Sequence, residues 1–489
     1  LVLSIDKMGL QKGTIDIPRE IVIERSPDEE QGVERPRKES YWKALIAVFT
    51  AGCAFMSDGY QQGIMTPINL VLKRAYPEYT SKYSTMVSNS NLVANIIGQI
   101  FFGLFVDRIG RKQGFTITTS FIIIGSVIAA CSKGSTQIAM FWMLTIARGI
   151  TGFGIGGEYP TSAASAMEAA DEKLSNRKKL VPFILATNFP ISFGLPFASC
   201  IFLIFLSIWG EDHLSGVWRS CFGFGAVFPT IIFYFRWRMD HAKMFKKNAI
   251  KRKVPYSLIL KKYWKPLLGV SGVWFIMDFV IYPNNIFSSS VLSVVIPKAS
   301  VKKTAEWLLL LGSFATFGAC FGMLINRWFT RKQIIIMGFF SYGVISIIVG
   351  AAFEKLAKIP ALFVIFYGLM SFVIYAGPAN MQSVVSSESF PTCIRGTLYG
   401  LSAGIGKAGA AIGTEIFTPI QTHAGTKYTF FLSGGLSLIG CLFAYFIIVN
   451  TDKYDLAEKD EKFNQYLVEQ GWKGFIGESN EKQKLGVED

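Results

Sequence analysis

Charged residues are scarce in this sequence of 489 residues. Asp, Glu, Lys and Arg make up 17% of it, whereas a soluble protein of this size carries about 25%. Hydrophobic residues make up 51%, and the mean hydropathy is +0.37. Because too little polar surface remains to cover a water-soluble fold, we expect a membrane protein.

Metal-binding and catalytic patterns are also missing. The three histidines, His213, His241 and His423, fall in predicted loops, which argues against a histidine proton relay. The seven cysteines are scattered without a CxxC pair or other metal-ligand spacing, so we expect free thiols. No nucleophile and base emerge as a pair, and we expect neither an enzyme nor a cofactor.

The net charge of +15 could indicate a nucleic-acid partner. The basic residues lie instead in short runs between apolar segments, which is typical of membrane topology, and we expect no nucleic acid. The glycine-rich run 152–158 lies inside an apolar segment, with no preceding strand and no following Lys-Ser or Lys-Thr. It therefore does not match a nucleotide-binding loop.

Apolar segments of about 20 residues are long enough to cross a bilayer core of about 30 Å. Twelve can be drawn: 44–65, 89–107, 114–131, 138–160, 180–208, 217–236, 266–296, 306–326, 333–353, 361–380, 396–419 and 428–449. We therefore expect an all-α membrane protein with two six-helix pseudo-symmetric halves, 44–236 and 266–449. Residues 1–43 and 450–489 would be terminal segments, and 237–265 a central loop.

The loops on one predicted side hold about twice as many Lys and Arg residues as those on the other. The positive-inside rule then places both termini and the central loop in the cytosol. A plain cytoplasmic anchor is the alternative interpretation of that basic loop. Residues 1–40 lack the pattern of a cleavable signal peptide, so we expect the first span to act as the targeting signal.

A weak repeat supports the two halves. Asp107–Lys112 lies between the second and third spans, and a degenerate copy, Asn326–Lys332, lies between the eighth and ninth. Duplicated halves are typical of transporters, because rocking one half against the other exposes a site between them to either side.

The run DRIGRK at 107–112 resembles the loop motif of the major facilitator superfamily, and it lies where that family places it. The resemblance covers nearly the whole chain. It implies the major facilitator fold and a gating role for Asp107, Arg108, Gly110 and Arg111. The proline-rich motifs of sugar porters after spans 6 and 12 are absent.

Gly154–Pro160 resembles the GxGGDYP segment of fungal phosphate:proton symporters, with Glu158 in place of Asp. Trp274, Asp278 and Tyr282, and the run Ser402–Lys407, are similar to positions that line the phosphate site in that family. The details of 57–60, 157–162 and 283–289 look more like fungal glycerophosphoinositol permeases. That resemblance implies uptake of glycerophosphodiesters with protons.

Asp58, Arg148, Glu158, Asp278 and Lys407 all lie inside the predicted spans. Placing one charged side chain at mid-membrane costs about 2.5 to 3.5 kcal/mol, so we expect each of these residues to have a function or a partner. Proton coupling requires a carboxylate whose protonation changes as its surroundings change. We expect Asp278 to fill this role, with Asp58 and Glu158 as a possible relay.

Trp274, Asp278 and Tyr282 are four residues apart, which places them on one face of a helix. Ordinary packing would explain the two aromatic residues but not the carboxylate. Lys407 lies among small residues that leave room around its ammonium. We expect Lys407 to receive a phosphodiester anion, and an ion pair with a carboxylate is the alternative.

Other candidates for substrate binding are Tyr159, Arg148, Asn188, Asn284 and Asn285. The amides both donate and accept hydrogen bonds, as a polyol headgroup requires. Bonds between helices are their alternative role. Arg148 lies ten residues before Glu158, about 15 Å along a helix, so the two should not pair, and Arg148 could instead lock one conformation.

The combined expectation is a plasma-membrane, proton-coupled symporter that imports a glycerophosphodiester by alternating access, acting as a monomer. Glycerophosphoinositol is the preferred substrate, followed by glycerophosphocholine. The alternatives are an inorganic phosphate:proton symporter and a transporter-like nutrient sensor.

Overall fold

The computed structural model describes residues 54–174, 179–237, 254–296, 299–452 and 456–472, together with Leu45, Val48 and Phe49. The helices within these ranges belong to one compact unit, residues 40–489. No strand occurs among the described residues.

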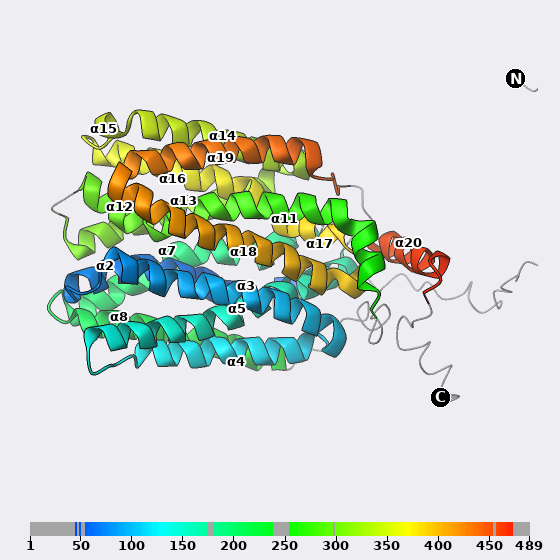
Figure 1. The fold of residues 1–489 in the computed structure, drawn as a ribbon, viewed down its shortest axis with the longest axis horizontal. Helices are drawn as coiled ribbons and strands as arrows, with labels where there is room; N and C mark the ends of the chain where they lie inside the picture. Colours follow the sequence, from blue (N-terminus) through cyan, green and yellow to red (C-terminus); the bar gives the residue numbers. More distant parts are fainter. Residues whose placement is uncertain are drawn as a thin grey trace, which may run out of the picture. The chain divides into compact units, whose positions relative to one another are not determined.

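Twelve helical rods correspond to the twelve predicted spans, and several rods are interrupted once (Figure 1). The first half contains α2 (Phe55–Ala75), α3 (Ser81–Ile109), α4 (Arg111–Ala130), α5 (Gln137–Lys173), α6 (Leu180–Ala186) with α7 (Asn188–Trp209), and α8 (Leu214–Phe224) with α9 (Val227–Trp237). The second half contains α11 (Tyr256–Ile286) with α12 (Ser288–Val295), α13 (Val301–Ile325), α14 (Arg331–Ala351), α16 (Pro360–Ala376) with α17 (Pro378–Ser389), α18 (Arg395–Pro419) and α19 (Thr426–Ile447). Shorter elements are α15 (Phe353–Leu356), η2 (Thr392–Ile394), η3 (Ile420–Ala424) and α20 (Leu456–Glu469).

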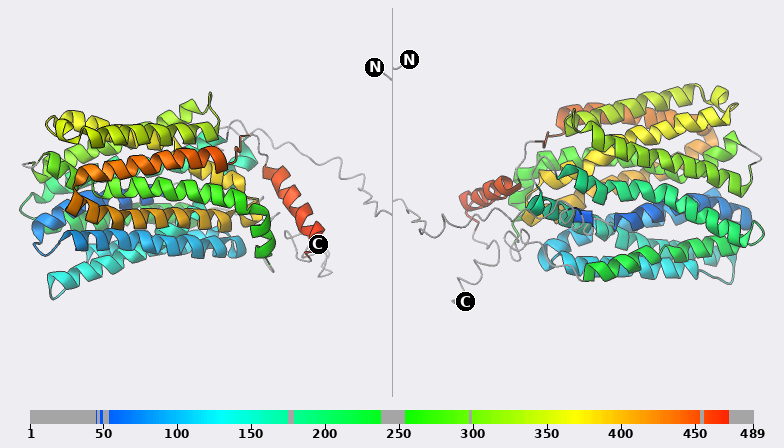
Figure 2. Two further views of the ribbon diagram at one scale, coloured as in Figure 1. Left: turned by 45° about the horizontal axis from the view of Figure 1, so that its top comes forward. Right: turned by 180° about the vertical axis from the view of Figure 1, so that it is seen from behind.

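The two halves meet through two helix pairs. α3 packs against α18, and α7 packs against α13 (Figures 1 and 2). The first contact is close because it is made through glycines: a Cβ on Gly400 would lie 3.0 Å from the Cα of Gly103. The first contact pairs the second rod with the eleventh, and the second contact pairs the fifth rod with the eighth. In each contact the second rod of one half meets the fifth rod of the other, as expected if the halves are related by a repeat.

Ten helices in the described part are long and apolar enough to cross a membrane. α2 and α18 are not among them. Both carry charged residues, including Asp58 in α2 and Lys407 in α18. Most of their polar side chains are buried inside the bundle. Because these side chains face other helices instead of lipid, α2 and α18 can be less apolar than the other rods.

Several predicted boundaries were wrong. The first rod continues to Ala75 instead of ending at 65, because Thr66 and Asn69 are buried within the bundle. α5 continues to Lys173, past the predicted end at Pro160, since one proline removes only one backbone donor. Residues 256–265, predicted as loop, form the first turns of α11.

The predicted tail also contains a helix, α20, at one end of the bundle (Figure 2). Leu456, Phe463 and Leu467 are spaced by seven and four residues, which gives α20 one apolar face. Phe463 and Leu467 pack with Phe390 and Ile394 in a small cluster beside the start of α11. A search for apolar segments of about 20 residues does not detect α20, because its apolar face is short and lies within a charged segment.

Candidate functional site

A buried ion pair joins α11 to α18 in the second half. The Nζ of Lys407 lies 3.1 Å from Oδ2 of Asp278, and both residues are 2% exposed. Lys407 also donates to the hydroxyl of Tyr282, one turn further along α11. Two of the three residues predicted to share a face of this helix therefore contact the predicted cation.

Glycines in α18 make this pairing possible. A Cβ on Gly406 would lie 2.6 Å from Cδ1 of Trp274, and the backbone of Phe275 closely approaches Gly409. Small residues let two helices approach closely, so α18 lies against α11 with Lys407 directed at the acid. The predicted role of the small residues around Lys407 agrees with this packing.

Tyr159 links the ion pair to the first half. Its ring lies beneath the Lys407 ammonium, with Nζ 4.9 Å from the ring centroid. Its hydroxyl donates to Oδ2 of Asp58 at 2.5 Å, and Gln62 donates to the other oxygen of that carboxylate. One lysine is thus bonded to an acid of the second half and connected, through a tyrosine, to an acid of the first.

Trp274 covers the same cluster from α11. Its ring centroid lies 6.5 Å from that of Tyr159 and 5.3 Å from that of Tyr399. All three members of the α11 stripe therefore face one buried site. Tyr399 was not predicted, because a tyrosine in an apolar helix gives no signal that distinguishes a site from ordinary packing.

Glu158 lies elsewhere. Its carboxylate accepts hydrogen bonds from Thr118 and Thr119 of α4, at 3.0 and 2.8 Å, and from Ser162 at 3.0 Å. These bonds hold α5 against α4. The relay from Glu158 to Asp58 stays a prediction, and the bonds described for Glu158 lead toward α4.

Arg148 contacts α2 and α8. Its guanidinium donates to the side chain and the carbonyl of Gln61, at 2.8 and 3.1 Å, and lies 5.7 Å from the ring centroid of Phe222. These contacts agree with the alternative, structural interpretation of Arg148. Its role in substrate binding stays a prediction.

Two of the predicted amides bond between helices. Asn188 donates to the carbonyl of Asn380 at 3.0 Å, which connects α7 to α17 across the two halves. Asn284 donates to Tyr342 and Ser433 at 3.0 and 2.9 Å. This geometry matches the role that was the alternative for both amides.

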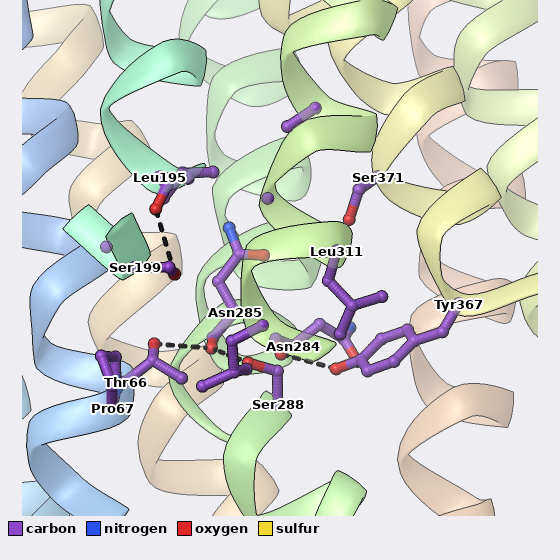
Figure 3. A pocket seen from close by; sticks show the side chains of 14 residues that line it. Thr66, Pro67, Leu195, Ser199, Asn284, Asn285, Ser288, Leu311, Tyr367 and Ser371 are labelled. Carbon is purple, nitrogen blue, oxygen red and sulfur yellow. Dashed lines mark hydrogen bonds between the residues drawn. The ribbon is translucent and has the colours of Figure 1, made fainter. Parts of the chain in front are cut away.

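A cavity lies near these amides, between α2, α7, α11, α13 and α16 (Figure 3). The space between atoms there amounts to about 480 Å³, part of which is open solvent. Polar groups of Asn285, Ser288 and Ser199 line it beside Leu195 and Leu311, among others. Its lining combines hydroxyls and amides with apolar side chains, as expected for a polyol site with one hydrophobic wall.

Asp107 fastens the halves together at one end of the bundle, here called the motif end. Its carboxylate accepts from the backbone N–H groups of Gly396 and Thr397, at 3.2 and 2.6 Å, and from the Thr397 hydroxyl at 2.8 Å. An anion at the start of α18 also interacts favourably with the helix dipole. Gly110 has φ of +100°, which lets the chain turn sharply from α3 into α4. The side chains of Arg108 and Arg111 lie outside the described part.

A second, unpredicted contact at the motif end centres on Glu388 of α17. Arg331 lies 3.0 Å from its carboxylate, and Lys179 lies 3.8 Å from it and 2.8 Å from Asp171. Of these ion pairs, Lys179 with Glu388 joins the two halves. These ion pairs could not be predicted, because in a sequence a charged residue that is buried at the end of a span cannot be distinguished from one in a solvated loop.

α20 attaches to this same contact. Lys459 donates to the carbonyls of Glu388 and Ser389, at 2.7 and 3.1 Å. Burial, together with the nearby charge of Arg395, lowers the pKa of Lys459 to about 7. Asp460 accepts from the backbone N–H of Thr392 at 2.7 Å. The helix therefore holds the end of α17 and the start of α18 in place.

Replacing Asp107 by alanine should make the motif end open more often, because three bonds between the halves are lost. Opening should be favoured by about 2 kcal/mol, or roughly 30-fold. The rate at which a thiol reagent modifies Cys393, which is 4% exposed, can measure this by peptide mass spectrometry. Thr85→Val, which removes a bond to Thr418 at the other end, is the control. Equal modification rates in Asp107→Ala and wild type would show that Asp107 does not hold this end closed.

Within the described part, no group of three or more His, Cys, Asp or Glu residues could hold a metal ion. The side chains that the structure brings together at the site are a buried ammonium, two nearby carboxylates, and phenol and indole rings.

Comparison with solved structures supports the fold. The xylose transporter XylE from E. coli, in a partially occluded inward-open conformation, matches 86% of this chain and 100% of its own with a TM-score of 0.70. The sequence identity is 15%, so this likeness concerns the fold alone. It confirms the predicted twelve-helix major facilitator fold.

Curated relatives are much closer in sequence. Glycerophosphoinositol permease 1 of Candida albicans is 46% identical over 94% of this chain and 89% of its own length. Glycerophosphoinositol transporter 1 of Saccharomyces cerevisiae is 42% identical over 90% of this chain and 86% of its own. The model of the sugar (and other) transporter family matches residues 43–246 and 240–463. The chain therefore belongs to the sugar (and other) transporter family of the major facilitator superfamily.

Proposed function

We propose that this protein is a proton-coupled symporter that imports a glycerophosphodiester, with glycerophosphoinositol as the first choice and glycerophosphocholine as the second. The names and high identity of the two fungal relatives support this class of substrate. The observation that carries the proposal is the buried pair of Lys407 and Asp278, with the ring of Tyr159 against the ammonium and that of Trp274 beside Tyr159.

The ion pair suggests how substrate and proton are coupled. A phosphodiester carries one negative charge, and it competes with Asp278 for Lys407. When the anion pairs with the Lys407 ammonium, the negative charge of Asp278 no longer has a partner. A carboxylate that is buried without a cation is more stable in its protonated form, so Asp278 binds a proton. Anion and proton then occupy the site together, and the net charge of the loaded site equals that of the empty one.

The headgroup then occupies the nearby cavity. Its hydroxyls and amides, including Thr66, Ser199 and Asn285, match the alternating donors and acceptors of an inositol ring. The apolar wall at Leu195 and Leu311 faces the carbon skeleton. In this arrangement the phosphodiester defines the substrate class, and the cavity ranks the headgroups.

Alternating access requires contacts between the halves that break at each end. At the motif end these are the Asp107 bonds and the ion pair between Lys179 and Glu388. At the opposite end, where α2 and α18 finish, they are hydrogen bonds such as Thr85 to Thr418 and Asn89 to Glu415, at 3.0 and 2.6 Å. The halves, residues 44–236 and 266–449, would rock about the site between them.

The proposal includes a location. We place the protein in the plasma membrane as a monomer that carries transport and no enzymatic activity. Both termini and the central loop, 237–265, face the cytosol. The excess of Lys and Arg in the loops of that side supports this orientation.

An inorganic phosphate:proton symporter is the second candidate, supported by the likeness of 154–160 and of Trp274, Asp278 and Tyr282 to that family. A nutrient sensor would bind the same ligands without moving them. Labelled glycerophosphoinositol uptake, competed by phosphate and by glycerophosphocholine, separates the first two candidates. Accumulation of the labelled substrate in the compartment that the membrane encloses separates both transporters from a sensor.

The decisive measurement is uptake by proteoliposomes with and without an imposed proton gradient. Accumulation of glycerophosphoinositol should need an inward proton gradient, because carboxylates lie in the site, and it should collapse when a protonophore is added. A sodium gradient at matched pH is the control. Full uptake driven by sodium alone would contradict proton coupling.

A further inference from the structure

Lys73, near the end of α2, forms a hydrogen bond that crosses from one half to the other. Its Nζ lies 3.3 Å from Oγ of Ser290 in α12. The side chain is half-buried, and in the described part of the chain no carboxylate pairs with it. A neutral hydroxyl is thus the partner of this half-buried ammonium.

Other basic side chains at this end are paired differently. Three of them lie within 3.3 Å of a carboxylate: Arg74 with Glu211, Lys303 with Glu306 and Lys427 with Glu354. A lysine near the end of a span ordinarily extends its ammonium toward water. Lys73 instead forms its hydrogen bond with Ser290 of the other half. Extension of the ammonium toward water does not explain this contact.

Lys73 lies on the same helix as a residue that lines the cavity. Thr66, which lines the cavity, donates to the carbonyl of Asn285 at 3.0 Å (Figure 3). Lys73 lies seven residues, or two turns, further along the same face of α2, about 10 Å away. Its partner Ser290 follows Ser288, which also lines the cavity. Two successive bonds therefore join α2 to the α11–α12 segment beside the cavity, and Lys73 forms the one nearer the end of α2.

We infer that Lys73 and Ser290 form an outer anion-binding site, at which a phosphodiester docks before it enters the cavity and reaches Lys407. This inference rests on the proposed function, since it assumes an anionic phosphate substrate. The anion neutralises the ammonium, and the Ser290 hydroxyl can donate to a second phosphate oxygen. Because the anion then replaces the bond between α2 and α12, its arrival also loosens this contact between the two halves.

The test separates charge from hydrogen bonding. Lys73→Gln keeps a donor for Ser290 but removes the charge, Lys73→Arg keeps the charge, and Lys303→Gln is a matched control at the same end. Initial rates of glycerophosphoinositol uptake should show a KM about tenfold higher in Lys73→Gln with kcat unchanged, and the salt dependence of KM should be smaller. Lys73→Arg should restore KM to within about threefold of wild type.

A wild-type KM and salt dependence in Lys73→Gln would overturn the outer site, as would an equal rise of KM in Lys303→Gln. If wild type does not transport glycerophosphoinositol, the proposed substrate is wrong, and the same series with inorganic phosphate tests the outer site by the same criteria. If wild type transports neither anion, both proposals fail. Ser290→Ala is a second variant: it should raise KM less than Lys73→Gln, because the charge remains.

Discussion

Lys407→Ala should weaken the binding of every glycerophosphodiester to the same extent. The phosphodiester is common to all of them, and the low effective dielectric of a buried site strengthens its attraction to the ammonium. Loss of one partner from a buried charged interaction removes about 2 to 5 kcal/mol, which corresponds to at least about 30-fold in Kd. Binding of a series with inositol, choline and glycerol headgroups to purified protein measures the effect.

Asn285→Ala is the matched comparison for Lys407→Ala. Asn285 lines the cavity but carries no charge, so its replacement should change the ranking of headgroups without a uniform loss. Because Lys407→Ala leaves Asp278 unpaired, the double variant Asp278→Ala/Lys407→Ala restores charge balance and checks that lost binding is not lost folding. Wild-type affinity of Lys407→Ala for the whole series would show that the phosphate subsite lies elsewhere.

Asp278→Asn should leave the protein folded in the membrane but abolish proton-driven accumulation. Asn keeps the shape of Asp and can still accept from Lys407, whereas it cannot take up the proton that the mechanism requires. We expect at least about a hundredfold loss of accumulation against a gradient, since coupling by this group is all or none. Surface expression and uptake are measured side by side.

Exchange of substrate down its own gradient gives a second measurement for Asp278→Asn. It should persist, because exchange needs no net proton movement, and the unpaired Lys407 still attracts the anion. Asp58→Asn is a second variant that tests the predicted relay, since Asp58 reaches the cluster through Tyr159 instead of through Lys407. Normal, pH-dependent accumulation by Asp278→Asn would place the coupling carboxylate at another residue.

Much of the site could be predicted, because a charge inside an apolar segment is rare and easily recognised. Asp278 and Lys407 stood out in this way, and the four-residue spacing placed Trp274, Asp278 and Tyr282 on one face of α11. Glu158 stood out equally, yet it binds the hydroxyls of Thr118 and Thr119. A sequence shows that a buried charge needs a partner, but it does not show which neighbouring helix provides one.

Charges near the ends of spans could not be interpreted in the same way. Glu388, Lys179 and Arg331 have the composition of ordinary loop ends, and only the packing of α17 against α14 and against the first half buries them. Lys73 is a similar case, because one predicted span ended before it and its partner Ser290 lies in the other half. The amide of Asn188 bonds to a backbone carbonyl of α17, which no local pattern could indicate.

By itself, the sequence determined the class of protein, the number of rods and the rare charged residues inside them, since hydropathy, span length and charge are local properties of a chain in a bilayer. The tertiary structure alone decided the partners: Lys407 with Asp278, Tyr159 with Asp58, and Asp107 with the start of α18. These contacts join residues more than a hundred positions apart, because glycines such as Gly400 and Gly406 let particular helices approach. Helix approach depends on the shape of both surfaces together, and neither sequence segment contains that information alone.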